Sequence, residues 1–206
     1  MLLLFCDNTI CTIYCVVIGI FIPISVTFPK IIPSTFIDAI FPSFFRIIEV
    51  DAGKICTIRE CVASNVGFWV MPIPSAHESL HTDENGHYKE LGYMIRTNNQ
   101  TFFHAGDMCM YDGLIDTLKQ FQIDIAFLPI NGRDYFRNRD DIIGNFNCRE
   151  AVLLAKEIGA EMLVPMHHDL YQVNRVSVAD FVSTVEELDA YRKYHIFAPG
   201  ELYINM

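Results

Sequence analysis

Three groups of polar residues, each placed directly after an apolar run, contain side chains of the types that bind metals and activate water. They are His77, Asp107, and His167 with its neighbours His168 and Asp169. The apolar runs predict buried strands, and the end of a strand holds a side chain rigidly beside an opening loop. Two imidazoles and a carboxylate suit zinc, manganese or iron. Each group taken singly is also typical of a structural histidine or an ordinary turn, so the metal site is a hypothesis that rests on their combination.

A polar loop after the apolar run at residues 123–129 contains the residues that we expect to bind a substrate, Asn131, Arg133 and Asn145. An Arg beside a metal can grip a phosphate or a carboxylate through two parallel bonds. Surface ion pairing is the alternative for the other charged residues of this loop, which are Asp134, Arg137, Arg139 and Asp140.

The remaining polar residues near these strand ends have two interpretations each. His168 and Asp169 either orient the neighbouring imidazole through its second ring nitrogen or cap the next segment. His81 and His87 lie in a turn-like stretch, where exposure to solvent is the better interpretation. His104 lies within a predicted strand, and we expect it to be buried and hydrogen-bonded rather than bound to metal.

The chain changes from a hairpin-rich first part to a second part in which strands alternate with helices. Strands are predicted at residues 46–50, 67–73, 92–96, 101–104, 123–129, 161–165, 195–197 and 202–204. Helices are predicted at residues 31–40, 114–121, 147–158 and 177–191. Asn147 or Asn145 is the expected N-cap of the third helix, and Ser177 that of the fourth. This order predicts an α/β protein of layered sheets flanked by helices.

Length and composition favour a single globular domain. The 206 residues are 51% hydrophobic and 19% charged, which suffices for a buried core. A formal charge of −10 without a basic cluster argues against a nucleic acid as partner and favours a small molecule. Seven cysteines, odd in number and irregularly spaced, predict neither a disulfide framework nor a zinc-binding pair and indicate a reducing cytoplasm. The oligomeric state stays open, a homo-oligomer included.

The N-terminal segment has a different texture, since residues 10–28 are uncharged and mostly apolar. Three interpretations stay open for it: a membrane segment, buried strands, or sequence without a folded purpose. Pro23 and the preceding Asp7 weaken the membrane interpretation. We therefore divide the chain into residues 1–28, whose status is open, and a domain at residues 29–206.

Five short motifs follow one another in one order and are more specific together than any one of them alone. They are Pro74-Ser75-Ala76-His77-Glu78, Asp83-Glu84-Asn85-Gly86 with Leu91-Gly92-Tyr93, His104-Ala105-Gly106-Asp107, Leu128-Pro129-Ile130-Asn131-Gly132-Arg133-Asp134, and Pro165-Met166-His167-His168-Asp169. With these motifs the chain resembles metallo-β-lactamase-fold hydrolases of the branch that includes L-ascorbate-6-phosphate lactonase. The resemblance implies an αββα sandwich, here incomplete at the N-terminus.

The resemblance also implies a two-metal centre between two sheets. His77 would bind the first metal, Asp107 would bridge both metals as the catalytic carboxylate, and His167 would bind the second. The metals implied are manganese or zinc, with iron as a further candidate, and the implied substrate is a phosphorylated sugar lactone. Water activated by the metals would open the lactone ring without a protein nucleophile.

One element of the family pattern is missing from the sequence. The run His-x-His-x-Asp-His occurs nowhere in it, and the uncharged stretch in its place contains no His. Without this run each metal keeps two ligands, fewer than the three or four protein groups that hold a catalytic zinc. We therefore expect a hydrolase impaired by this loss, or alternatively a non-catalytic remnant produced by truncation or a frameshift. Alternatively, His77, Asp107 and His167 could together hold a single ion, with open coordination positions.

Overall fold

The computed structural model divides into two compact units, one of Met1–Glu49 with Phe197–Met206 and one of Val50–Ile196. The structure describes Leu2–Asp7, Ile10–Val17, Ile20–Thr27, Cys56–Ile58, and residues 68–97, 100–142, 144–169, 171–198, 201 and 203. The helix predicted at residues 31–40 and the strand predicted at 46–50 lie outside the described residues, as does most of the strand predicted at 202–204.

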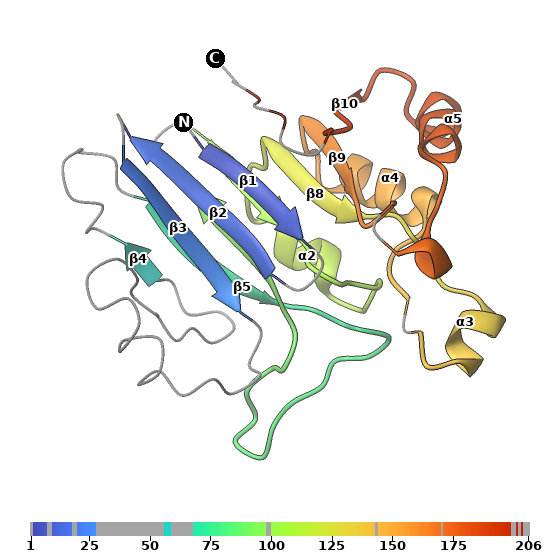
Figure 1. Cartoon of the computed structure of the whole chain (residues 1–206), viewed down its shortest axis with the longest axis horizontal. Helices are drawn as coiled ribbons and strands as arrows, with labels where there is room; N and C mark the ends of the chain where they lie inside the picture. Colours follow the sequence, from blue (N-terminus) through green and yellow to red (C-terminus); the bar gives the residue numbers. More distant parts are fainter. Residues whose placement is uncertain are drawn as a thin grey trace. The chain divides into compact units, whose positions relative to one another are not determined.

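The first unit contains a three-stranded sheet of order β1-β2-β3. Strands β1 (Leu2–Asp7), β2 (Ile10–Val17) and β3 (Ile20–Thr27) pair antiparallel with their neighbours in sequence (Figure 1). Two residues separate β1 from β2, and two separate β2 from β3, a spacing typical of β-hairpins. Of the interpretations left open for residues 10–28, the structure describes strands at Ile10–Val17 and Ile20–Thr27. Among the described residues, no helix has the length and apolar character needed to cross a membrane.

The second unit is built on a seven-stranded mixed sheet of order β10-β9-β8-β7-β6-β5-β4. Its strands are β4 (Cys56–Ile58), β5 (Phe68–Pro74), β6 (Leu91–Arg96), β7 (Thr101–His104), β8 (Ile125–Pro129), β9 (Met162–Met166) and β10 (Lys193–Tyr194). Neighbours from β4 to β7 are antiparallel, and neighbours from β7 to β10 are parallel. The predicted change from hairpins to strand-helix-strand units is confirmed, because a parallel pair needs a long crossover and an antiparallel pair only a turn.

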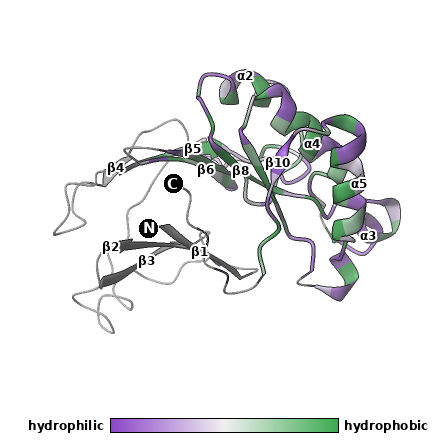
Figure 2. Ribbon diagram, turned by 90° about the horizontal axis from the view of Figure 1, so that it is seen from above, coloured by the Kyte–Doolittle hydropathy of each residue, from purple (hydrophilic) through white to green (hydrophobic). Residues whose placement is uncertain are grey.

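Helices supply the crossovers on the parallel side of this sheet. Helix α2 (Leu114–Leu118) connects β7 to β8, α4 (Cys148–Glu157) connects β8 to β9, and α5 (Val178–Leu188) connects β9 to β10. Figure 2 shows α2, α4 and α5 on one face of the sheet, as right-handed crossovers that progress in one direction require. A short helix, α3 (Tyr135–Arg139), precedes α4 in the β8–β9 connection.

The helix boundaries follow local hydrogen bonds. Asn147 is the N-cap of α4 and forms a capping box with Glu150, which decides between the two caps predicted for this helix. Ser177 is the N-cap of α5, as predicted. Helix α2 ends before the predicted residue 121, because Phe121 N donates to Leu118 O at 3.0 Å and closes a tighter turn there.

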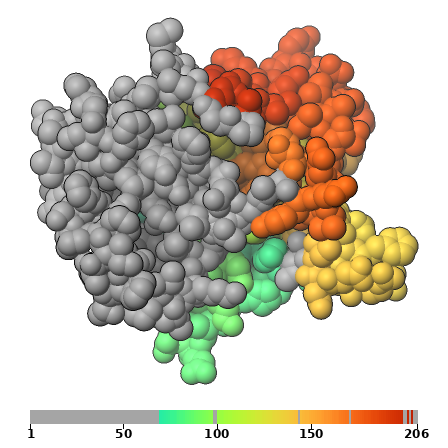
Figure 3. All heavy atoms as spheres, viewed as in Figure 1, coloured from blue at the N-terminus to red at the C-terminus, as the bar shows by residue number. Residues whose placement is uncertain are grey.

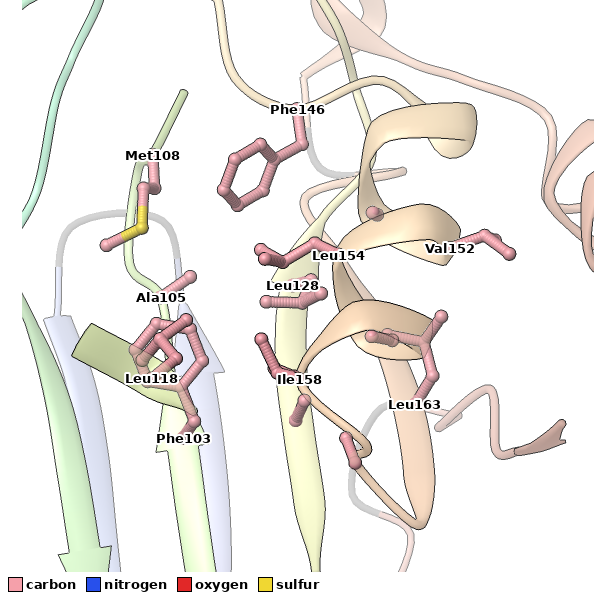
Figure 4. Close-up of a cluster of buried hydrophobic side chains, with 14 of the residues drawn as sticks. Phe103, Ala105, Met108, Leu118, Leu128, Phe146, Val152, Leu154, Ile158 and Leu163 are labelled. Carbon is pink, nitrogen blue, oxygen red and sulfur yellow. The ribbon is translucent and has the colours of Figure 1, made fainter. Parts of the chain in front are cut away.

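The core lies between the sheet and its helices. Every described residue of β7, β8 and β9 is buried, which explains why their sequences are almost continuously apolar. In Figure 4, Phe103 and Leu128 of the strands lie near Leu118 and Leu154 of the helices, and all four belong to one buried cluster. This packing holds the ends of the strands in place, and the polar residues of the predicted site directly follow those ends.

The strand predicted at residues 195–197 is wrong. The last strand is β10, in which Lys193 and Tyr194 pair with Met162 and Leu163 of β9. Beyond it, His195 N still donates to Leu163 O at 3.1 Å, and the pairing ends there. The apolar spacing of the sequence could not show this, because the register of an edge strand is set by its neighbour.

Candidate functional site

Five strands of the seven-stranded sheet run in the same direction, and four of them end beside the predicted site residues. Strands β7, β8 and β9 are parallel, and β5 shares their direction because it is antiparallel to β6, which is antiparallel to β7. The residues that follow them are His77 after β5, Asp107 after β7, Asn131 after β8 and His167 after β9. The sheet therefore places the predicted site residues at one edge, where open α/β sheets bind ligands.

Asp107 is the centre of the contacts at this edge. The imidazole Nδ1 of His167 lies 3.0 Å from Asp107 Oδ1. The amide Nδ2 of Asn145 donates to the same oxygen at 3.1 Å and to Asn131 Oδ1 at 3.0 Å. These four residues, here called the Asp107 network, join three strand ends to the loop that precedes α4.

The surroundings of Asp107 favour its ionised form. Burial raises the pKa of this carboxyl, but the hydrogen bond and the charge of His167, the charge of His77 and the bond from Asn145 lower the pKa to about 2. The Asp107 side chain keeps 45% of its surface exposed, so a ligand can reach it. His77 is half-buried and contributes through its charge.

Two residues at this edge have an unusual backbone. His167, directly after β9, has a φ of 59°, and Glu78, which follows His77, has a φ of 69°. Residues with a Cβ rarely adopt this left-handed region, and such residues concentrate at functional sites, where the surrounding structure holds them in place. The backbone of His167 therefore marks the end of β9 as a candidate functional position.

Arg133, which we expected to bind substrate, pairs with a residue of α4. Its guanidinium donates to both carboxylate oxygens of Glu150, at 3.0 and 2.7 Å, and to the backbone oxygen of Asn145 at 2.8 Å. Glu150 also accepts from Asn147 N at 3.0 Å. Glu150 was not among the residues singled out from the sequence. Its spacing from Asn147, Asn-x-x-Glu, is the capping-box signal that could have found it.

The neighbouring polar residues mostly agree with the sequence expectations. His104 is buried, accepts a bond from Gly106 N at 3.1 Å and stacks on Phe127, as expected of a structural residue. His81 and His87 are exposed, also as expected.

The residues after His167 pair with each other. His168 Nδ1 lies 3.8 Å from Asp169 Oδ1. The carboxylate recorded beside the His167 ring is Asp107, 3.0 Å from its Nδ1. A carboxylate does contact the His167 ring, but it belongs to Asp107, whereas Asp169 pairs with His168.

The surface ion pairs predicted in the α3 segment are present. Arg137 Nε lies 2.6 Å from Asp134 Oδ2, and Arg139 Nε lies 3.0 Å from Asp140 Oδ1. Figure 3 shows the α3 side chains, in yellow, on the surface. Arg137 also donates to the backbone oxygen of Asn131 at 2.8 Å, which ties α3 to a member of the Asp107 network.

The donor types of the site fit a divalent transition metal, whereas their number falls short of a complete centre. Asp107 and His167 offer an adjoining carboxylate and imidazole. Asn145 Oδ1 is buried without a hydrogen-bond partner among the described residues. Within the described part of the chain, no three His, Cys, Asp or Glu side chains are grouped closely enough to hold an ion. The structure thus joins two of the three predicted ligands, with His77 near enough to act on the Asp107 charge.

Comparisons with known proteins agree on one superfamily. The family model described as the beta-lactamase superfamily domain matches residues 31–168. A metal-dependent hydrolase of the UPF0173 group from Methanoculleus marisnigri is 28% identical over 131 residues, which cover 62% of this chain and 54% of that protein. A second one, from Pyrobaculum islandicum, is 27% identical over 60% of this chain and 49% of that protein. The chain spans about half the length of these curated relatives.

A solved structure supports the fold. Igni18, a metallo hydrolase from Ignicoccus hospitalis, has a TM-score of 0.57 and 22% identity, covering 81% of this chain and 64% of that protein. The motifs pointed to this fold, and the family match extends over more than half of the 206 residues. The chain therefore belongs to the beta-lactamase superfamily and has the metallo-β-lactamase fold.

Proposed function

We propose that this chain acts as a metal-dependent hydrolase in which Asp107 and His167 bind a divalent metal, with His77 as a third ligand. The observation that carries the proposal is the pairing of Asp107 with His167 at 3.0 Å, at the edge where β7 and β9 end. The superfamily match and the names of the relatives, which are metal-dependent hydrolases, support the same class.

Each residue of the site has a role that follows from its contacts. A bound divalent metal supplies a water of near-neutral pKa and polarises the carbonyl under attack. Asp107 offers a carboxylate that is ionised at neutral pH, since its pKa is about 2. His167 directs Nδ1 to Asp107, so Nε2 is the ring nitrogen left for a ligand. Catalysis then needs no protein nucleophile.

The substrate that we propose is an ester or lactone, and the specific expectation from the motif resemblance is a phosphorylated sugar lactone. Arg133 is the residue expected to grip the phosphate. Because its guanidinium binds both carboxylate oxygens of Glu150, phosphate binding requires this pair to open. A lactone with and without a phosphate is the matched comparison, and equal turnover of both would count against phosphate recognition by Arg133.

A non-catalytic protein that keeps the fold is the second candidate. Two observations favour it: the described residues contain no three-ligand group, and the run His-x-His-x-Asp-His is absent from the sequence. A catalytic zinc needs three or more protein ligands. This candidate predicts a folded chain that binds neither Zn²⁺ nor Mn²⁺.

Metal binding separates the two candidates. The purified full chain is loaded with Mn²⁺ or Zn²⁺, dialysed, and its metal content measured by mass spectrometry. The hydrolase predicts at least one retained ion per chain, lost in Asp107→Ala and His167→Ala but retained in His81→Ala, a change at an exposed histidine outside the network. A wild-type chain that is folded but retains no metal would refute the hydrolase. Hydrolysis of simple lactones by the loaded chain then tests the activity directly.

A further inference from the structure

Asn145 is the least exposed member of the Asp107 network. Only 2% of its surface is accessible, although both ends of its side chain are polar. Its Nδ2 makes two hydrogen bonds, to Asp107 Oδ1 and to Asn131 Oδ1. Its Oδ1 is buried without a hydrogen-bond partner among the described residues. Such a side chain is out of reach of a substrate, so its contact with Asp107 is the feature that needs an explanation.

The orientation of the amide is determined by Asp107. A carboxylate accepts hydrogen bonds, so the amide must turn its nitrogen toward Asp107. If the amide were rotated, Oδ1 would face the Asp107 carboxylate, and both hydrogen bonds that Nδ2 donates would be lost. The unpartnered Oδ1 is the consequence of keeping the donor on Asp107, and an uncompensated buried acceptor is rare enough in proteins to indicate a constraint.

The backbone of Asn145 is held from two sides. Arg133 donates to its carbonyl oxygen at 2.8 Å while it is paired with Glu150 of α4. Asn145 N donates to Gly132 O at 3.2 Å. The amide therefore starts from a fixed backbone, which allows it to fix the direction of the group that it contacts.

Both donors act on one oxygen of Asp107. Oδ1 receives the Asn145 amide at 3.1 Å and His167 Nδ1 at 3.0 Å. Two donors on one oxygen limit rotation of the carboxylate and leave Oδ2 for a ligand. The same arrangement keeps the proton of a neutral His167 on Nδ1, so that Nε2 carries the free lone pair.

We propose that Asn145 is a positioning residue, which holds Asp107 and His167 so that Asp107 Oδ2 and His167 Nε2 remain to bind a divalent cation. This inference rests on the proposed role of Asp107 and His167 as ligands. It assigns Asn145 a function through Asp107, in place of the direct substrate contact expected from the sequence. Partners that orient metal ligands in this way commonly change metal affinity by about 10–100-fold when they are removed.

The test uses Asn145→Ala, Asn145→Leu and the control Asn147→Ala in the full chain. Asn145→Leu keeps nearly the same shape and removes the donor without adding a charge, so it serves where the cavity of Asn145→Ala prevents folding. Asn147→Ala removes the α4 cap two residues away and leaves the Asp107 contact intact. Three quantities are measured: thermal stability, the affinity for Mn²⁺ by calorimetry, and the His167 tautomer in the metal-free chain from its ring ¹⁵N shifts.

Both Asn145 variants are expected to weaken Mn²⁺ binding by about 10–100-fold and to reduce the Nδ1-protonated tautomer of His167. Asn147→Ala is expected to lower the melting temperature and to leave both the Mn²⁺ affinity and the His167 tautomer unchanged. Wild-type affinity and an unchanged tautomer in the Asn145 variants would overturn the inference. If the wild-type chain binds no Mn²⁺, the proposed function fails, and the tautomer alone still decides the role of Asn145: a loss of the Nδ1-protonated form supports it, and no change refutes it.

Discussion

Replacing Gly144 by Ala tests how rigidly the loop that carries Asn145 is held. A Cβ on Gly144 would lie 2.1 Å from Arg133 Cβ and 2.6 Å from Gly132 O. Non-bonded carbon atoms settle at about 3.5–4.0 Å, so the two segments must separate by roughly 1.4 Å or more. A separation of that size would break the 2.8 Å bond from Arg133 to Asn145 O.

The cost combines two contributions. Overpacking of this kind costs about 1–3 kcal/mol, and the loss of a hydrogen bond to a charged group costs about 1.5 kcal/mol. We therefore expect Gly144→Ala to lower the free energy of unfolding by about 3 kcal/mol. For a denaturant dependence of about 2 kcal/mol per molar urea, the unfolding midpoint falls by roughly 1.5 M.

The control is the same substitution at Gly86. That residue has a φ of 84° and no atom within 4 Å of an added Cβ, so Ala there is strained only by its backbone. The expected cost is about 1–2 kcal/mol. Urea unfolding followed by circular dichroism compares the two variants with the wild type. A midpoint for Gly144→Ala no lower than that of Gly86→Ala would show that the loop yields easily, and the argument from the close approach would be refuted.

Three further predictions follow from single contacts. Asp107 should titrate near pH 2, so the stability that it contributes is complete above its ordinary pKa of 3.8 and is lost as the pH falls through about 2. Carboxyl ¹³C shifts measure this titration, and a midpoint at pH 3.8 or above would contradict the prediction. Phe103→Ala, at a side chain without exposed surface, should cost about 3–5 kcal/mol in urea unfolding, and a cost below 1 kcal/mol would contradict its place in the core. Ser177→Ala should cost about 1 kcal/mol by removing the N-cap of α5, with Ser177→Asp retaining the stability.

Much of the second unit could be predicted from local patterns. The apolar runs at residues 67–73, 101–104 and 123–129 correspond to β5, β7 and β8. The caps at Asn147 and Ser177 were visible because capping depends on residues within one turn of each other. The strand at residues 195–197 failed because edge pairing depends on β9, which lies about 30 residues away in sequence.

The candidate site was predictable as a set of residue types and only partly as a set of contacts. His77, Asp107 and His167 were found because each follows an apolar run of the sequence. The ion pair between Arg133 and Glu150 was not predicted, because the two residues are 17 positions apart and lie on a loop and at the start of a helix. The bond from Asn145 to Asp107 spans 38 residues, and nothing in the sequence spacing indicates which of several polar residues will make it.

The sequence by itself determined the α/β class, strands β5 to β9 with helices α2, α4 and α5, and the polar residues that follow the strands, whereas β4, β10 and α3 were not predicted. These properties are local, since the periodicity of side chains along a strand or helix and the chemistry of its ends are set by neighbouring residues. Only the tertiary structure decided that β5, β7, β8 and β9 end at one edge, and that His167 and Asn145 share one oxygen of Asp107. Those contacts depend on strand order, register and the path of each crossover, which are fixed when the elements pack together.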